Sequence, residues 1–152
     1  MSISVSYTQL AVFDPSLENP FNEWRKEHVA QGFSWRDGSV SFATLDDGPV
    51  DVEVQLSPRS AELLEVTVRA IRVPFRVPEA GRIEIASIAD GREVAMPAGD
   101  YALTYEHGRT DDGRMWSRLT FVPERPVPFA VLRADSELTP QDPLTTYANP
   151  AV

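Results

Sequence analysis

Alternation of apolar and polar residues with a period of two is the feature that most constrains the fold of this 152-residue chain. It is clearest where Val50, Val52, Val54 and Leu56 are separated by acidic or amide residues. Because successive side chains of a β-strand point to opposite faces, this pattern predicts a strand with one buried and one solvent-exposed face. Similar patterns recur along the chain at residues 3–7, 40–42, 66–77, 83–85, 101–105, 115–122 and 129–133.

Turn signals separate these stretches. Four Asp-Gly pairs lie between or beside them, at residues 37–38, 47–48, 90–91 and 112–113. Asp and Gly tolerate the positive φ angles that tight hairpin turns require. Within residues 66–77 the apolar positions move from even to odd residue numbers near Ala70, which a β-bulge or a change of sheet would produce. Pro74 cannot donate a ladder hydrogen bond, so its stretch is predicted at a sheet edge or a bulge.

A single segment has the features of a helix. Asn19 and Pro20 suit its cap and first turn, Trp24 and His28 follow one face, and Gly32 can end it. Many short strands with tight turns are typical of two packed antiparallel sheets. We therefore predict a mainly β protein, an antiparallel β-sandwich of about eight or nine strands with one short helix.

The length fits one domain of ordinary size. We expect residues 1–135 to form the sandwich and residues 136–152, with three prolines, to form a C-terminal tail that is either frayed or laid over the body as a strap. The chain has no cysteine, which suits a reducing compartment. No stretch approaches the roughly 18 apolar residues of a membrane span, and no leader is recognisable. We expect a cytoplasmic location and no membrane association.

The charge balance is strongly acidic, with 23 Asp and Glu against 14 Lys and Arg and a formal net charge of −9. Both halves of the chain carry an acidic excess, so the charge belongs to the folded surface. Such a surface repels nucleic-acid phosphate. We expect no direct binding to nucleic acid.

Residues suited to catalysis are scarce. The chain has two histidines and no cysteine, and it lacks the G-x-S-x-G motif of a serine nucleophile. His28 is predicted to pack against the sheet, and His107, beside Gly108, is predicted to lie in a loop. The paired acids at 46–47 and 111–112 do not match a calcium-loop pattern. We predict a protein that is not an enzyme and that has no cofactor or metal.

The same carboxylates are candidates for contact with a basic partner, because turns place them at the tips of hairpins. Trp35, next to the turn at residues 37–38, is a candidate anchor, since tryptophan is frequent at binding hot spots. The predicted partner-binding residues are Trp35, Asp37, Asp46, Asp47, Asp51, Asp111 and Asp112.

The order of several segments resembles the competence protein J family, the inhibitors of the DNA-entry nuclease in competent bacilli. The segments are Ser4-Val5-Ser6-Tyr7-Thr8-Gln9, Val12-Phe13, Trp24, Gly32-Phe33, residues 37–42, residues 73–77, residues 83–88 and residues 97–104. Each segment alone is common in β proteins, and the specificity comes from the set. The similarity covers roughly residues 3 to 106, and the stretch from Arg114 onward has no visible counterpart.

The resemblance implies a stoichiometric inhibitor of a metal-dependent, non-specific DNase. Its partner would be a DNA-entry-type nuclease or a related nuclease toxin, against which the chain would act as an immunity protein. The charge supports this interpretation, because a nuclease groove must be positive to hold phosphates. The alternative is a β-sandwich module that binds carbohydrate or another small ligand, which would present two or three coplanar aromatic side chains on one face.

Overall fold

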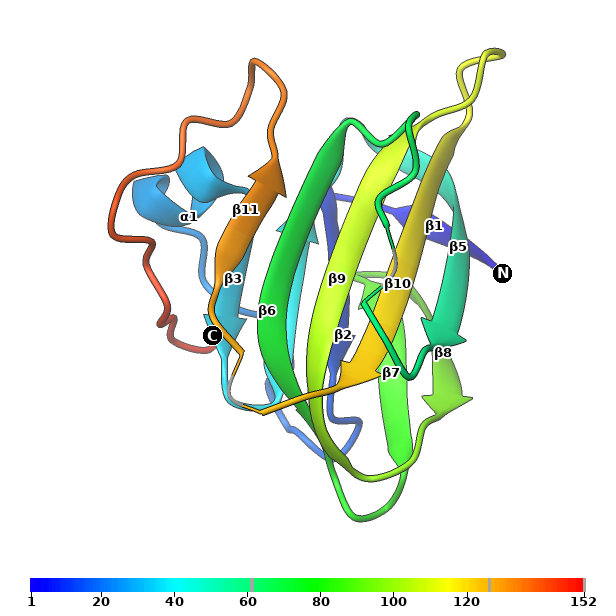
Figure 1. Ribbon diagram of the computed structural model, residues 1–152, viewed down its shortest axis with the longest axis vertical. Helices are drawn as coiled ribbons and strands as arrows, with labels where there is room; N and C mark the ends of the chain where they lie inside the picture. Colours follow the sequence, from blue (N-terminus) through cyan, green and yellow to red (C-terminus); the bar gives the residue numbers. More distant parts are fainter. Residues whose placement is uncertain (61, 126, 152) are drawn as a thin grey trace.

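The computed structural model describes residues 1–60, 62–125 and 127–151 and confirms the predicted mainly β, sandwich-like fold (Figure 1). The larger sheet has the strand order β1-β5-β10-β9-β6-β11. Its strands are β1 (Ser2–Val5), β5 (Gly48–Leu56), β10 (Met115–Pro123), β9 (Gly99–Arg109), β6 (Arg69–Val77) and β11 (Ala130–Arg133). The smaller sheet has the order β3-β4-β2-β7-β8. Its strands are β3 (Phe33–Arg36), β4 (Ser39–Ala43), β2 (Gln9–Phe13), β7 (Arg82–Ser87) and β8 (Asp90–Ala95).

The described residues form eleven strands, more than the eight or nine predicted. The additional strands are β2, β3 and β8. Strands β2 and β8 lack a period-two pattern, and β3 alternates over only four residues. All five residues of β2 are buried, because its outer face is covered by the chain that follows it, and β8 is largely exposed. A second difference is that β5 and β10 pair in parallel, with Met115 opposite Val50, whereas the other strand pairs of the described chain are antiparallel.

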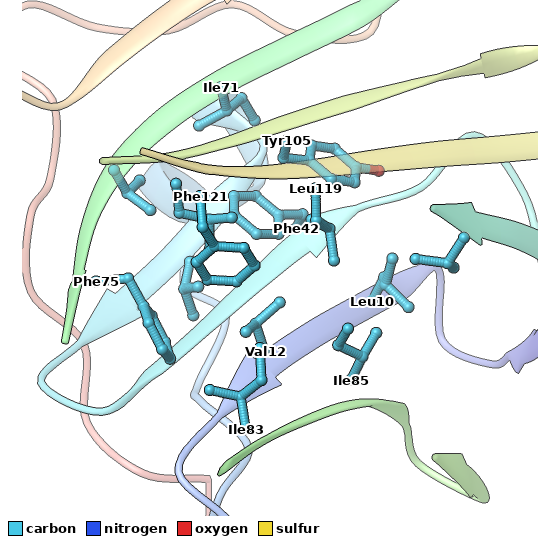
Figure 2. Close-up of a cluster of buried hydrophobic side chains, with 14 of the residues drawn as sticks. Leu10, Val12, Phe42, Ile71, Phe75, Ile83, Ile85, Tyr105, Leu119 and Phe121 are labelled. Carbon is cyan, nitrogen blue, oxygen red and sulfur yellow. The ribbon is translucent and has the colours of Figure 1, made fainter. Parts of the chain in front are cut away.

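The hydrophobic core lies between the two sheets (Figure 2). The smaller sheet contributes Leu10 and Phe42, and the larger sheet contributes Tyr105, Leu119 and Phe121, all with no measurable solvent exposure. The Phe42 and Tyr105 rings stack across the core with centroids 4.4 Å apart. Burial of each such side chain stabilises the fold by about 1.5–3 kcal/mol.

The helix is shorter than predicted. Helix α1 (Lys26–Gln31) begins several residues after Pro20, although it ends at Gly32 as expected, with Gly32 in the left-handed region at φ +85°. The segment before it is held in an irregular path by Asn22, whose buried amide donates to the carbonyl oxygens of Ser34 and Ser39 at 2.8 and 3.0 Å. These bonds tie the backbone to β3 and β4 and favour a non-helical course.

Two predicted turns lie elsewhere. Asp90 and Gly91 belong to β8, and the turn before that strand is made by Ile88 and Ala89. His107 is not a loop residue, because β9 continues to Arg109 and carries the histidine into the interior. Gly108 suggests a loop from composition, but β9 is long enough to pass through it, and the turn toward β10 begins only after Arg109.

The environment of Pro74 agrees with the expected sheet edge. On one side Pro74 lies opposite Ala102 of β9, and on the other side β11 pairs with residues 70–72 and does not reach it. The register of β11 shifts between Val131 and Arg133, opposite Ala70 and Ile71. The phase shift expected near Ala70 is not a bulge in β6, which keeps an unbroken register with β9 from Arg69 to Val77; Val66 and Val68 lie before the strand begins.

The C-terminal segment forms a strap over α1 (Figure 1, orange to red). The Gln31 side chain exchanges two hydrogen bonds with the backbone of Thr145, at 2.8 and 2.9 Å. The ring of His28 bonds to the Tyr147 carbonyl at 2.9 Å. Within the described residues, no helix has the length and apolar character that crossing a membrane requires.

Candidate partner-binding surface

Five of the predicted acidic residues gather at one end of the larger sheet, which we call the acidic end: Asp46, Asp47, Asp51, Asp111 and Asp112. The first two lie in the loop between β4 and β5, Asp51 lies on β5, and the last two lie in the β9–β10 hairpin, which projects at the top of Figure 1. The parallel pairing of β5 with β10 brings them together, because it places the starts of both strands side by side. All five side chains are exposed.

Local contacts distinguish the members of the acidic end. Asp112 accepts a hydrogen bond from the Thr110 hydroxyl and pairs with Arg114 at 3.0 Å, and these interactions lower the pKa of its carboxyl group. Asp46 lies 3.6 Å from Arg109. Asp51 and Asp111 make no ion pair or side-chain hydrogen bond with the part of the chain that the structure describes. Their charges are available to a partner.

Trp35 and Asp37 lie at the opposite end of the sheets, beside an open cleft of about 650 Å³. The Trp35 indole is half-buried, donates to the Pro74 carbonyl at 2.7 Å and packs edge-on against Phe129 at 5.0 Å. Across the cleft, Asp100 pairs with Arg76 at 2.9 Å. Trp35 is thus tied into the fold, and the cleft beside it is lined by both acidic and basic side chains.

The structure does not bring the seven predicted residues into one surface. Strand β9 runs between the two ends, and its ten residue steps span about 33 Å at roughly 3.3 Å per residue. A protein interface of ordinary size buries about 800 Å² per partner. Such a patch is about as wide as β9 is long. An interface centred on one end of the sheets would therefore reach the other end only at its margin.

Beside the acidic end, the structure shows a surface that sequence analysis missed, which we call the apolar groove. It has a volume of about 480 Å³ and is lined by Tyr7, Thr8, Gln9, Trp24, Val29, Ala43 and Ile88. These residues come from the turn before β2 and the first residue of that strand, the segment before α1 and the helix itself, the end of β4, and the turn after β7. The Trp24 side chain lines the groove, and its indole donates to the Gln9 side chain at 3.1 Å.

The turn that carries Tyr7 explains why the alternation was misleading. Tyr7 continues the spacing of Ile3 and Val5, which predicts a strand through this residue. In the structure β1 ends at Val5, and the chain crosses from the larger to the smaller sheet through a tight turn with Tyr7 at φ +55° and Thr8 at φ +47°. Non-glycine residues seldom adopt positive φ, and no local sequence signal predicts it here.

Side chains distant in sequence hold this turn in place. Asp47 of the acidic end accepts a hydrogen bond from the Thr8 amide at 2.7 Å. On the other side, the Ser87 hydroxyl accepts from the Ser6 amide at 2.9 Å and lies 2.9 Å from the Gln9 carbonyl oxygen. The acidic end and the apolar groove are therefore joined directly through one carboxylate.

Metal-binding geometry does not arise in the residues that the structure describes, since no three His, Asp or Glu side chains converge there. The two histidines act within the fold. His28 accepts a hydrogen bond from the Arg25 amide at 3.0 Å and bonds to the strap. His107 bonds to the Leu45 amide and the Ser117 hydroxyl in the interior.

The two packed, largely antiparallel sheets and the short helix place the chain among small β-sandwich proteins. A crystal structure of ComJ from Bacillus subtilis, an inhibitor of the DNA-degrading activity of NucA, superposes with a TM-score of 0.73. The match has 26% sequence identity and covers 82% of this chain and 94% of that one.

The chain belongs to the competence protein J family, whose profile matches residues 2–122. A DNA-entry nuclease inhibitor of Bacillus subtilis (strain 168) is 33% identical over 103 residues, which are 67% of this chain and 76% of the relative. The family match extends through most of β10, so the departure expected from Arg114 starts later, with β11 and the strap.

Proposed function

We propose that this protein is a stoichiometric inhibitor of a DNA-degrading nuclease and acts by binding the nuclease rather than by catalysing a reaction. The observation that carries the proposal is the combined sequence and fold similarity to the B. subtilis inhibitor, which spans nearly all of that protein's structure. The net charge of −9 supports it, because a surface that holds DNA phosphates attracts an acidic protein.

Inhibition would arise from occlusion of the DNA path. The acidic end presents carboxylates on a projecting hairpin and an adjacent loop, and these can occupy positions that phosphates would take in a positive groove. Charge complementarity of this kind speeds association and selects the partner. Asp37 and Trp35, at the far end of the sheets, would remain outside this contact.

A DNA-degradation assay tests the proposal. The protein is titrated against a fixed concentration of B. subtilis NucA, or of the DNase encoded nearest to its own gene, with divalent metal in excess. We expect complete inhibition near one inhibitor per nuclease, unchanged by further metal, with the nuclease recovered intact. Persistent DNA degradation at a large excess of the protein would reject the proposal, and relief by added metal would indicate chelation instead of occlusion.

Paired charge-neutralising variants test the assignment of the acidic end. Asp51→Asn and Asp111→Asn each remove one unpaired exposed charge, and together they should slow association severalfold because rim charges act mainly on the association rate. Asp37→Asn removes one exposed charge at the opposite end and is the matched control for each single variant. Equal association rates for the single variants and the control would show that the acidic end does not face the nuclease.

A further inference from the structure

We propose that the apolar groove receives an apolar side chain that projects from among basic residues on the nuclease surface. This inference rests on the proposed function and adds to it the point at which the inhibitor holds its partner. The acidic end would steer the two proteins together, and the groove would slow their separation.

The exposure of the groove carries the first part of the argument. Tyr7 is 77% exposed, Val29 is 57% exposed and Ile88 is 46% exposed, and together with Trp24 they form a continuous, predominantly apolar concave surface. Scattered single apolar residues are ordinary on protein surfaces, but a concave apolar patch with two aromatic residues is typical of a binding site.

The backbone of the turn carries the second part. Tyr7 and Thr8 hold positive φ angles that disfavour both residue types, and bonds from Asp47 and Ser87 enforce this conformation from two sides. Strained backbone persists where surrounding structure over-determines it, and such positions concentrate at binding sites. The consequence here is that an aromatic ring stands in solvent beside the groove with its backbone already ordered, which lowers the entropic cost of binding.

Charge identifies the occupant. The groove adjoins the acidic end through the Asp47–Thr8 bond, and Asp46 and Asp47 stand exposed at that side of it. A nuclease with basic residues around an apolar side chain complements this combination of an apolar floor and an acidic margin. A second copy of this chain does not, because each copy carries a charge of −9 and a symmetric contact would bring the two acidic ends close together.

The test measures association and dissociation rates of the inhibitor–nuclease complex, with NucA as the probe, for variants of the groove. Tyr7→Asn removes the ring and supplies a residue that tolerates positive φ, so the fold should be as stable as wild type or more stable. Val29→Glu places a charge in the groove at an exposed helix position. Each variant should raise the dissociation rate roughly 30-fold, as expected of a hot-spot residue, with little change in the salt dependence of association.

Tyr147→Asn is the matched control, since Tyr147 is 56% exposed on the strap and lies outside the groove. It should bind within twofold of wild type. Wild-type inhibition together with unchanged dissociation of both groove variants would overturn the inference and leave the proposed function standing. A dimer of the free protein that Val29→Glu dissociates would overturn it in favour of a second copy, and a wild-type chain that binds no nuclease would overturn both.

Discussion

His107 is a buried histidine whose two ring nitrogens both have partners. Its Nε2 atom accepts a hydrogen bond from the Leu45 amide at 3.0 Å, and Nδ1 lies 2.9 Å from the Ser117 hydroxyl. An acceptor nitrogen carries no proton, so the ring is neutral in the fold. Burial, together with the positive charge of Arg69, lowers the pKa of His107 to about 4.

The stability of the protein should therefore depend on this histidine in mildly acidic solution. The unfolded chain takes up a proton near pH 6.5, whereas the folded chain resists it until about pH 4, so the stabilisation is complete above pH 6.5 and is lost as the pH falls toward 4. Between pH 7.5 and 4.5 the wild type should lose about 2.5 kcal/mol more unfolding free energy than His107→Gln. Urea denaturation at both pH values measures this, and parallel losses in the two proteins would contradict the prediction.

At the scale of elements, the strap is held by α1 and by a short antiparallel bridge between Asn22 and Pro150. The Gln31 side chain is buried, donates to the carbonyl oxygens of Phe33 and Thr145, and accepts from the Thr145 amide. One amide side chain thus supplies two hydrogen bonds to the strap, in addition to the backbone bonds that join Glu23 to Asn149 and Ala151 to Phe21. The Leu138 side chain packs against Gly32, where an added Cβ would approach it to 3.0 Å.

Replacement of Gln31 by methionine, which has a similar shape, should loosen the strap. The change leaves the Thr145 amide and carbonyl without partners, and we expect a loss of about 2 kcal/mol in unfolding free energy. Hydrogen exchange at the Thr145 amide should accelerate as well. Thr145→Ala, which keeps the backbone groups and their bonds, is the control, and equal exchange in both variants would show that Gln31 does not hold the strap.

At the scale of the whole molecule, the acidic excess acts at long range. A net charge of −9 attracts a basic partner over distances comparable to the Debye length, about 10 Å at 0.1 M salt. The fold places Asp46, Asp47 and Asp51 beside the projecting β9–β10 hairpin, whose Asp111 and Asp112 are balanced by Arg109 and Arg114. Encounter with a nuclease should therefore be faster than for a neutral protein of the same shape.

The association rate should fall about tenfold or more between 10 mM and 300 mM salt, while the dissociation rate changes much less, because screening acts on the encounter and not on buried contacts. Stopped-flow mixing with the nuclease measures both rates. An association rate that is indifferent to salt would count against steering by the acidic surface, whatever the level of inhibition.

Much of the fold and part of the candidate site could be predicted locally. Alternation in residues 50–56 and the turn signals identified the sandwich, and Gly32 marked the end of the helix, because these features depend on neighbouring residues alone. The pattern could not reveal β2, whose five residues are all buried, since the chain that covers its outer face follows a path set by the buried Asn22. The alternation also predicted a strand at Tyr7, where the backbone instead forms a turn with φ +55°.

The class of fold, the acidic charge and the membership of a nuclease-inhibitor family follow from periodicity, composition and the order of segments, which are properties of the chain alone. Which of the charged residues lie together depends on the packing of strands that are distant in sequence. The parallel pairing of β5 and β10 joins loops more than 60 residues apart into the acidic end, and it leaves Trp35 and Asp37 at the other end of the sheets. The groove likewise exists because Asp47, 39 residues along the chain, holds the turn that displays Tyr7.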